Sequence, residues 1–290
     1  MQLRTIYAQQ FAPQKLLGKS EQTDKLYRST LGLLARYLAR EPVVTDLTDA
    51  EACRFLAWYK TTGVSIRSVN NRRDYLLAFW RWCARKRIVE EWPDVEKLPT
   101  DPIEPDSWSL DEVRRLIAAT RDEPQVGKQP GWLFWESIHL VWWDSGERTT
   151  ATLSCRWRDY SAETGLLFIP ASMRKGKKKH ATYHLKPRTR ELLSIMRALD
   201  PAAELIFATP FTPHTFYHRY ERILKRAGLP SGRRNKPQKM RRTFASYIEA
   251  NGGDATEALQ HTARRVTTEH YIDPRIVVRP PPNLLLPEVG

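Results

Sequence analysis

The chain has 290 residues, enough for two domains of ordinary size, and its hydrophobic content of 41% with ten tryptophans excludes a disordered protein. Its formal net charge of +14 and its pI near 9.8 are typical of a protein that binds a polyanion such as nucleic acid, although a basic protein with merely solvated lysines has the same balance. The start of the chain lacks the apolar run of a signal peptide, and no stretch predicts a membrane span. We therefore expect a cytoplasmic protein with no membrane partner.

The three cysteines, Cys53, Cys83 and Cys155, are odd in number and far apart. They predict neither a disulfide framework nor a zinc site, and they fit a reducing compartment. Cys53 and Cys83 lie among apolar residues and are expected in a core. The chain has no carboxylate cluster or His/Cys spacing of the kind that holds a metal, so we expect neither a metal nor a cofactor.

Residues 1–98 are predicted to form a helical domain. Apolar side chains recur at three- and four-residue spacing over 20–40, and Thr48-x-x-Glu51 reads as a capping box that opens a second helix. A longer helix is predicted from Ser65 to Lys86. Its polar face either is solvated or meets a DNA backbone, and the candidate DNA contacts on it are Arg67, Asn70, Asn71 and Arg73.

A proline-rich linker over 99–108 is predicted to precede a second domain, 109–290, that ends in a C-terminal tail. Two short β-rich runs, 166–169 and 181–185, flank a basic turn and predict an antiparallel hairpin. The rest of this domain is predicted to be helical, with helices opening at the capping box Ser109-x-x-Glu112, over 132–143, from Pro187, and over 214–227, 239–250 and 254–261. The predicted fold class is therefore mainly α with a small antiparallel β-sheet.

Four short motifs in the second domain carry side chains that suit phosphodiester chemistry. A tyrosine phenol can attack a phosphodiester only where arginines hold the phosphate, since a guanidinium offers two parallel donors to its oxygens. The motifs are Ser145-Gly146-Glu147-Arg148, Arg174-Lys175-Gly176-Lys177, Gln238-Lys239-Met240-Arg241, and the run from His261 to Thr267-Thr268-Glu269-His270-Tyr271.

These motifs resemble those of the tyrosine recombinase (phage integrase) family. The segment around Arg148 is similar to the family's T-G-x-R-x-x-E-x-x-x-L-x-W-x-D box, and Lys175 matches the lysine of its K-G-x-K-x-R hairpin. The string around Arg241 resembles H-x-L-R-H-T-F-A, and the run from His261 to Tyr271 resembles G-H-x-x-x-x-T-T-x-x-Y. Residues 78–84 also resemble the last helices of the family's core-binding domain.

The resemblance implies a site-specific recombinase that cleaves and rejoins double-stranded DNA through a covalent 3′-phosphotyrosine, without a cofactor, as a homo-tetramer made of two dimers. Tyr271 would be the nucleophile, and Lys175 would protonate the departing oxygen, although Lys177 could exchange roles with it. The remaining catalytic positions implied are Arg148, Gln238, Arg241 and His261. The implied DNA contacts in this domain are Arg174, Lys177, Lys178, Lys179, Lys239 and Arg242.

The chain departs from the family pattern at several positions. Ala151 stands where a glutamate is usual, Gln238 where a histidine is usual, and Gln260 where a glycine is usual. A glutamine can donate a hydrogen bond to a phosphate oxygen, but it cannot take a proton from the tyrosine. Two alternatives therefore stay open: a catalytically weakened DNA-binding protein of the same fold, and strand nicking and resealing like that of a type IB topoisomerase.

Overall fold

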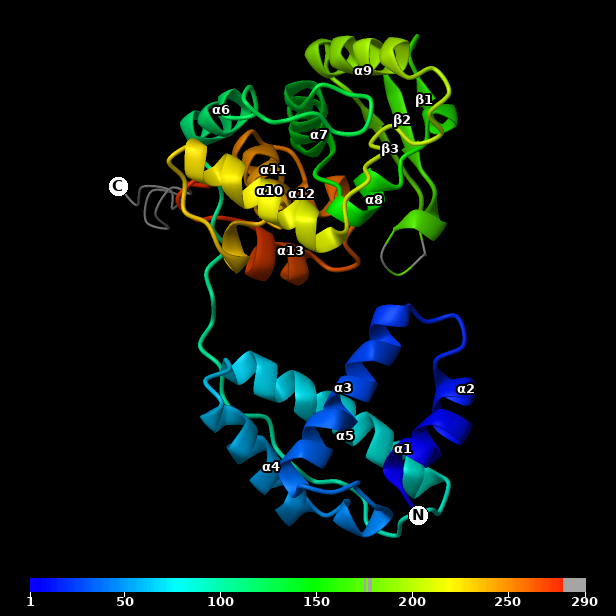
Figure 1. Cartoon of the computed structure of the whole chain (residues 1–290). Helices are drawn as coiled ribbons and strands as arrows, with labels where there is room; N and C mark the ends of the chain where they lie inside the picture. Colours follow the sequence, from blue (N-terminus) through cyan, green and yellow to red (C-terminus); the bar gives the residue numbers. More distant parts are fainter. Residues whose placement is uncertain (175, 177–178, 279–290) are drawn as a thin grey trace, which may run out of the picture. The chain divides into compact units, whose positions relative to one another are not determined.

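The computed structural model describes residues 1–174, 176 and 179–278, and the chain divides into two compact units, Met1–Pro102 and Ile103–Gly290 (Figure 1). The division falls inside the predicted linker, and Trp108 is fully buried within the second unit. The fold is mainly α with one three-stranded antiparallel sheet, which confirms the predicted class. Among the described residues, no helix is long and apolar enough to cross a membrane.

The first unit is helical. The three predicted helices are present, and the second begins where the Thr48 hydroxyl accepts a hydrogen bond from the Glu51 amide, as the capping box predicts. These helices are α3 (Glu21–Leu38), α4 (Asp49–Thr61) and α5 (Ile66–Arg85). The sequence did not predict the short turns that accompany them, which are α1 (Leu3–Ile6), η1 (Tyr7–Phe11), α2 (Ala12–Lys15) and η2 (Val44–Asp46).

The apolar faces of these helices meet in one core that includes Phe55, Phe79 and Trp80. Cys83 is buried in this core, as predicted, whereas Cys53 is exposed and that prediction is wrong. Cys53 lies on the outer side of α4, because the helical repeat turns its neighbours Ala52 and Phe55 toward the core.

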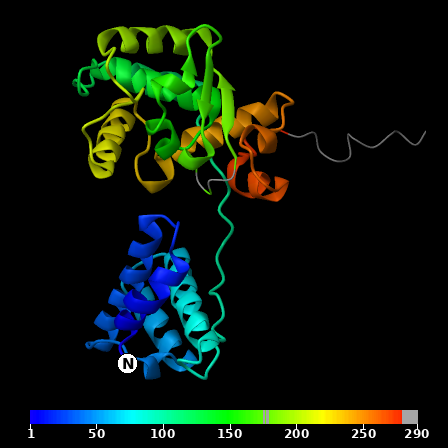
Figure 2. The same cartoon turned by 90° about the vertical axis from the view of Figure 1, so that its right-hand side faces the viewer.

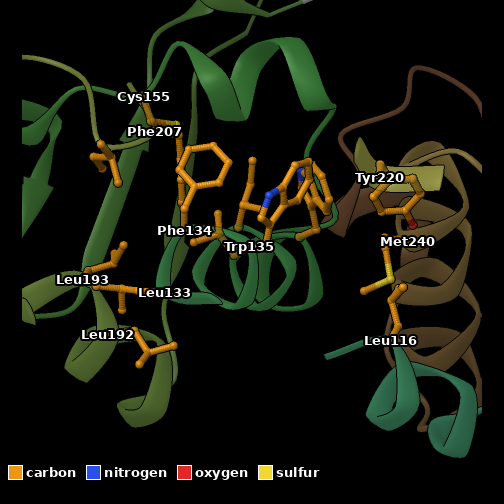
Figure 3. Close-up of a cluster of buried hydrophobic side chains, with 14 of the residues drawn as sticks. Leu116, Leu133, Phe134, Trp135, Cys155, Leu192, Leu193, Phe207, Tyr220 and Met240 are labelled. Carbon is orange, nitrogen blue, oxygen red and sulfur yellow. The ribbon is translucent and has the colours of Figure 1, made fainter. Parts of the chain in front are cut away.

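The core of the second unit is built around α7 (Gly131–Ser145). This helix is apolar on nearly all sides, which is the pattern of a helix buried among other elements. It contacts α9 (Pro187–Leu199), α11 (Gln238–Ala250) and the sheet (Figure 2). Figure 3 shows Leu133, Phe134 and Trp135 of α7 among side chains from the surrounding elements, all of them nearly inaccessible to solvent.

The sheet has the order β1–β2–β3 and is antiparallel throughout. The two predicted runs form β2 (Leu166–Ile169) and β3 (Ala181–His184), with Leu167 opposite Tyr183, whereas the short β1 (Tyr160–Ser161) was not predicted. The connection between β2 and β3 contains Arg174, as the predicted hairpin requires. Of the predicted site residues on this hairpin, Lys175, Lys177 and Lys178 lie outside the described residues, as does the tail from 279 to 290.

Shorter helices complete the second unit. The capping box at Ser109 and Glu112 is formed in full, with each side chain bonded to the other's backbone amide. The helix predicted over 254–261 ends earlier, because Gln260 takes a left-handed backbone conformation with φ of 53°. These elements are α6 (Leu110–Ala118), α8 (Thr149–Leu153), η3 (Trp157–Asp159), η4 (Ala171–Met173), α10 (Pro213–Arg226), η5 (Arg233–Asn235), α12 (Ala255–Ala258) and α13 (Arg264–Tyr271).

Candidate active site

Arg241, on α11, lies where three segments of the second unit meet. It is 1% exposed. Its Nη1 donates to the Gly146 carbonyl at 2.7 Å and its Nη2 to the Leu259 carbonyl at 3.1 Å, and Nη2 lies 3.2 Å from Nε2 of His261. The end of α7, the end of α12 and α11 itself therefore fix the direction of one guanidinium.

The turn after α7 depends on Gly146. This residue has φ of 58°, and a Cβ at its position would lie 2.3 Å from the Phe244 ring, so both the backbone conformation and the packing require glycine. The turn places Glu147 and Arg148 beside Arg241. Arg148 is half-buried at the start of α8. The burial of Arg241 and the like charge of Arg148 lower the pKa of Arg241.

Tyr271 is the last residue of α13, and its ring packs against the same cluster. The rings of His261 and Tyr271 have centroids 4.6 Å apart, and the guanidinium carbon of Arg241 lies 5.5 Å from the Tyr271 ring centroid. One turn earlier on α13, the fully buried Thr267 places its hydroxyl 2.9 Å from Nδ1 of His261. The first threonine of the Thr-Thr-x-x-Tyr string thus orients the histidine.

His261 is neutral at neutral pH. Burial, followed by the charges of Arg241 and Arg148, lowers the pKa of its imidazole to about 4. The contacts fit a proton on Nδ1 that is donated to Thr267 and a free Nε2 lone pair that accepts from Arg241, a tautomer assigned from the hydrogen bonds.

The structure therefore brings Arg148, Arg241, His261 and Tyr271 into one cluster, which we call the cage. Gln238 is exposed at the first residue of α11, one turn before Arg241. The structure gives no contact for its side chain, so its role stays a prediction. Within residues 1–174, 176 and 179–278, no group of three or more His, Cys, Asp and Glu could hold a metal ion.

A buried carboxylate, Glu147, belongs to this site and was missed in the sequence. Its side chain has no exposed area, and it forms an ion pair with Nε of Arg174 at 2.6 Å and a longer one with Nη1 of Arg241 at 3.6 Å. It also accepts from the Tyr183 hydroxyl at 3.1 Å and from the Arg148 amide at 2.8 Å. An acidic residue directly before the motif arginine was the available signal.

Three residues of the second unit that were predicted to contact DNA have intramolecular partners. Arg174 is buried in its ion pair with Glu147. Lys239 and Arg242 both pair with Asp106, each at 2.8 Å, and Lys239 also covers the Trp108 ring. The structure thus gives these three cations internal partners, and their DNA contacts stay predictions, while Lys179 is exposed.

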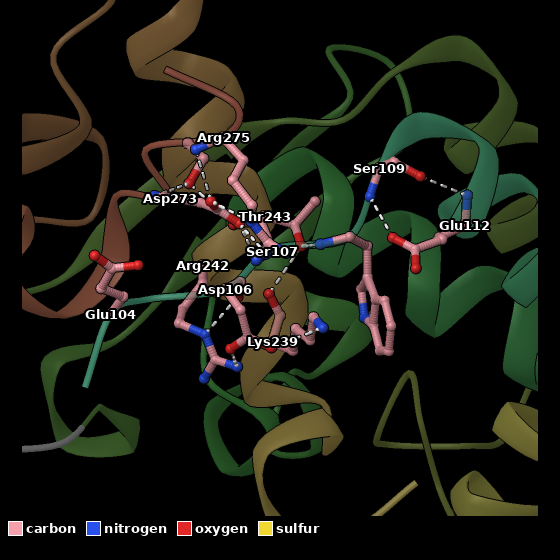
Figure 4. Close-up of polar contacts among 12 residues, drawn as sticks. Glu104, Asp106, Ser107, Ser109, Glu112, Lys239, Arg242, Thr243, Asp273 and Arg275 are labelled. Carbon is pink, nitrogen blue, oxygen red and sulfur yellow. Dashed lines mark hydrogen bonds and ion pairs between the residues drawn. The ribbon is translucent and has the colours of Figure 1, made fainter. Parts of the chain in front are cut away.

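Asp106 belongs to a second polar network, which we call the clasp (Figure 4). The Ser107 amide donates to the Asp273 carboxylate at 2.6 Å, and the Trp108 amide donates to the Thr243 hydroxyl at 2.9 Å. The Ser246 hydroxyl donates to the Tyr271 carbonyl at 3.1 Å and accepts from the Asp273 amide at 2.9 Å. The clasp, consisting of Asp106, Ser107, Trp108, Lys239, Arg242, Thr243, Ser246 and Asp273, therefore fixes the chain directly after Tyr271.

Two candidate DNA contacts of the first unit are also occupied. The Asn70 amide bonds both the carbonyl and the amide of Leu98, and Arg73 donates to the Val95 carbonyl. These side chains hold residues 95–98 against α5, a contact that the polar face could not reveal. Arg67 and Asn71 are exposed and carry no such contact.

The chain is 25% identical to tyrosine recombinase XerA from Pyrococcus furiosus over 286 aligned residues, which cover 92% of each chain. No family model matches the sequence.

Several solved structures share the fold. They include a lambda integrase dimer bound to a COC′ core site, with a TM-score of 0.72 and 17% identity over 91% of this chain and 96% of that one. The Tn1549 transposon integrase in complex with transposon right-end DNA has a TM-score of 0.72 and 13% identity over 97% and 96%. The XerH recombinase bound to its difH substrate has a TM-score of 0.67 and 19% identity over 90% and 76%. The chain is therefore similar to a tyrosine recombinase over 92% of its length, and it shares the fold of the solved integrases.

Proposed function

We propose that this protein is a site-specific DNA recombinase that cleaves and rejoins strands through a covalent 3′-phosphotyrosine at Tyr271. The observation that carries the proposal is the packing of the Tyr271 ring against His261, at 4.6 Å between centroids, and against the Arg241 guanidinium, at 5.5 Å. A phenol in this position lies beside the cations that a phosphate requires.

The chemistry follows from the charges in the cage. Attack of the Tyr271 hydroxyl oxygen on phosphorus builds negative charge on the two non-bridging oxygens, and Arg148 and Arg241 are the guanidiniums available to stabilise it. The phenol proton passes to water as the bond to phosphorus forms. The bond to the 5′-oxygen breaks, and that oxygen leaves with a proton, which we assign to Lys175. The phosphotyrosine conserves the energy of the broken bond, so a 5′-hydroxyl can reverse the step without ATP.

His261 would assist from a neutral state. Its Nε2 is engaged by Arg241, so a phosphate that enters the cage takes over the Arg241 donor and leaves the imidazole beside a new anion. That anion favours a protonated or re-tautomerised imidazole, which can donate to a non-bridging oxygen. Gln238 at the start of α11 would add a neutral donor.

The proposed partner is double-stranded DNA, which the basic chain would hold through phosphate contacts. The exposed candidates for these contacts are Arg67 and Asn71 of the first unit and Lys179 of the second. Lys177 and Lys178, which lie outside the described residues, are proposed from the sequence alone. Lambda integrase has been solved as a DNA-bound dimer, and we propose that two such dimers of this chain form the active tetramer. Three free cysteines fit action in the reducing cytoplasm.

The decisive variant is Tyr271→Phe, tested on a nicked suicide duplex from which the cleaved strand end escapes. The wild type should accumulate a protein–DNA adduct on denaturing gels, and Tyr271→Phe should form none while binding the duplex nearly as well. Tyr247→Phe, which removes a hydroxyl elsewhere in the second unit, is the control and should form adducts.

Each outcome separates the alternatives. A wild type that binds but never forms an adduct would indicate a DNA-binding protein of this fold. Adduct formation with strand relaxation but no Holliday junctions would indicate a nicking and resealing enzyme. Adducts at the wild-type level in Tyr271→Phe would place the nucleophile elsewhere.

A further inference from the structure

A buried carboxylate adjoins the cage at a position where the family pattern does not call for one. The pattern expects a glutamate three residues after Arg148, but Ala151 stands there and is itself buried on α8. Glu147 lies on the other side of Arg148 in the sequence, and its side chain has no exposed area.

All the acceptor capacity of Glu147 that the structure shows is directed at the site. Oε2 accepts from Arg174 and Tyr183, while Oε1 accepts from the Arg148 amide and lies 3.6 Å from Nη1 of Arg241. Burial alone would raise the pKa of this carboxyl, but the Arg148 amide and the two guanidiniums hold the pKa below its usual value. The carboxylate is therefore charged and bridges two buried arginines from different elements.

A second departure from the family pattern holds one of the same arginines. Gln260 stands where glycine is usual and keeps a left-handed backbone, with φ of 53°, although a side chain disfavours it. Its amide oxygen accepts from Nη1 of Arg174 at 2.5 Å. Arg174 is thus held by Glu147 on one side and by Gln260 on the other, and it directly precedes Lys175 in the hairpin.

We propose that Glu147 is the positioning residue of this site, a buried carboxylate that sets the Arg241 guanidinium and anchors the hairpin through Arg174, with Gln260 as its partner. The inference rests on the proposed function. Without the negative charge, two guanidiniums in one buried space repel each other, and Arg241 keeps only neutral partners, the two carbonyls and His261. The anion thus takes the place of the glutamate absent at Ala151.

The test compares Glu147→Gln with Glu123→Gln. Glu123 is a matched control, because its side chain is equally inaccessible and pairs with Arg226, and none of its recorded partners belongs to the cage. In single-turnover cleavage of the suicide duplex at saturating protein, Glu147→Gln should lose about 10²-fold in rate, as a misplaced catalytic group does. Glu123→Gln should cleave at the wild-type rate wherever it is folded, and the Kd for DNA should stay within about 2-fold for both.

A neutral substrate separates positioning from damage to the fold. A duplex with a methylphosphonate at the scissile position carries no negative charge for Arg241 to neutralise, so the deficit of Glu147→Gln should shrink at least 10-fold on it, by the same argument. A variant that is merely unfolded in part would lose equally on both substrates.

Gln260→Gly keeps the test valid if Glu147→Gln does not fold. Glycine accepts the left-handed backbone without strain, so this variant should be at least as stable as the wild type while losing one bond to Arg174. It should cleave about 5-fold more slowly, which corresponds to one hydrogen bond.

Wild-type cleavage by folded Glu147→Gln, or an equal deficit on both substrates, would overturn the inference. Wild-type cleavage by Gln260→Gly would do so if Glu147→Gln is unfolded. A wild-type protein that forms no adduct at all would instead refute the proposed function.

Discussion

The cage and the clasp lie on two sides of α11 and both contain basic side chains. Their basic residues nevertheless bind different partners. In the cage, Arg241 is bound by two carbonyls and a neutral histidine beside the ring of Tyr271. In the clasp, Lys239 and Arg242 are bound by Asp106, at the start of the second unit. Arg241 of the cage lies beside the Tyr271 ring, whereas the clasp fixes the backbone directly after Tyr271.

The difference between the cage and the clasp indicates that the role of a basic residue depends on its partner and not on its position in a motif. Lys239, Arg241 and Arg242 lie within four consecutive positions of one helix, and a phosphate-binding role could be expected of all three. Only Arg241 contacts the tyrosine ring. Substitutions in the cage should therefore impair chemistry, and substitutions in the clasp should impair stability.

The largest expected effect separates two adjacent arginines. Arg241→Ala should slow cleavage by roughly 10²- to 10³-fold, because it removes a preorganised donor to the transition state. Arg242→Ala should lower the melting temperature and leave the rate of the folded protein within about 3-fold, since it bonds to Asp106 and to the Arg234 carbonyl, and neither residue belongs to the cage. Single-turnover cleavage and thermal melts of both variants check this. Equal rate losses with unchanged melting would place Arg242 in the DNA interface, as the sequence suggested.

A smaller effect is expected from Asp106→Asn. Burial would raise the pKa of this carboxyl, but Lys239 and Arg242 hold the pKa below its usual value, so the charge contributes to stability above the unfolded pKa and is lost as the pH falls through the folded one. The neutral amide should cost about 1–3 kcal/mol of unfolding free energy. That corresponds to roughly 2–4 °C of melting temperature for each kcal/mol. Adduct formation well below the melting temperature should not change, and loss of it there would make the clasp part of the chemistry.

The smallest effect concerns pH. The pKa of His261 is lowered to about 4 in the folded protein, whereas its value in the unfolded chain is near 6.5. Above about pH 6.5 the imidazole is neutral in both states, so it does not change the free energy of unfolding. Between pH 6.5 and 4 the unfolded chain binds a proton that the folded chain does not, so stability falls as pH falls.

His261→Gln should reduce the slope of the unfolding free energy against pH between pH 4 and 6.5, by at most the slope that the uptake of one proton produces. His139, fully buried with its pKa also lowered to about 4, should keep its own contribution in the variant. Urea unfolding from pH 4.5 to 7.5 measures the slope. An unchanged slope in His261→Gln would mean that the histidine has the same pKa in the folded and unfolded protein, which contradicts a lowered pKa in the folded state.

The sequence predicted much of the cage and little of the clasp, for a physical reason. Arg148, Arg241, His261 and Tyr271 sit in strings whose spacing is fixed by local helices and turns. The clasp joins Asp106 to Arg242, which is 136 positions away, and such a contact leaves no local pattern. Glu147 was hidden in the same way, since its main partner Arg174 comes from a hairpin 27 residues later.

The fold shows the same division. Helices with clear apolar stripes or capping boxes were predicted, whereas α13 was not, because Thr267 is its one buried residue and leaves no apolar stripe in the sequence. The polar face of α5 did not reveal the contacts of Asn70 and Arg73, since a face that meets solvent and a face covered by residues 95–98 have the same composition.

The residue that becomes linked to DNA identifies the nucleophile directly. The adduct trapped on a suicide duplex can be digested with nuclease and trypsin, and the peptide that carries the linked nucleotide can be identified by mass spectrometry. We expect the nucleotide on Tyr271, in the tryptic peptide that runs from Val266 to Arg275. A phosphonucleotide on Tyr247 or any other residue would contradict the account, because the cage would then surround a tyrosine that does not react.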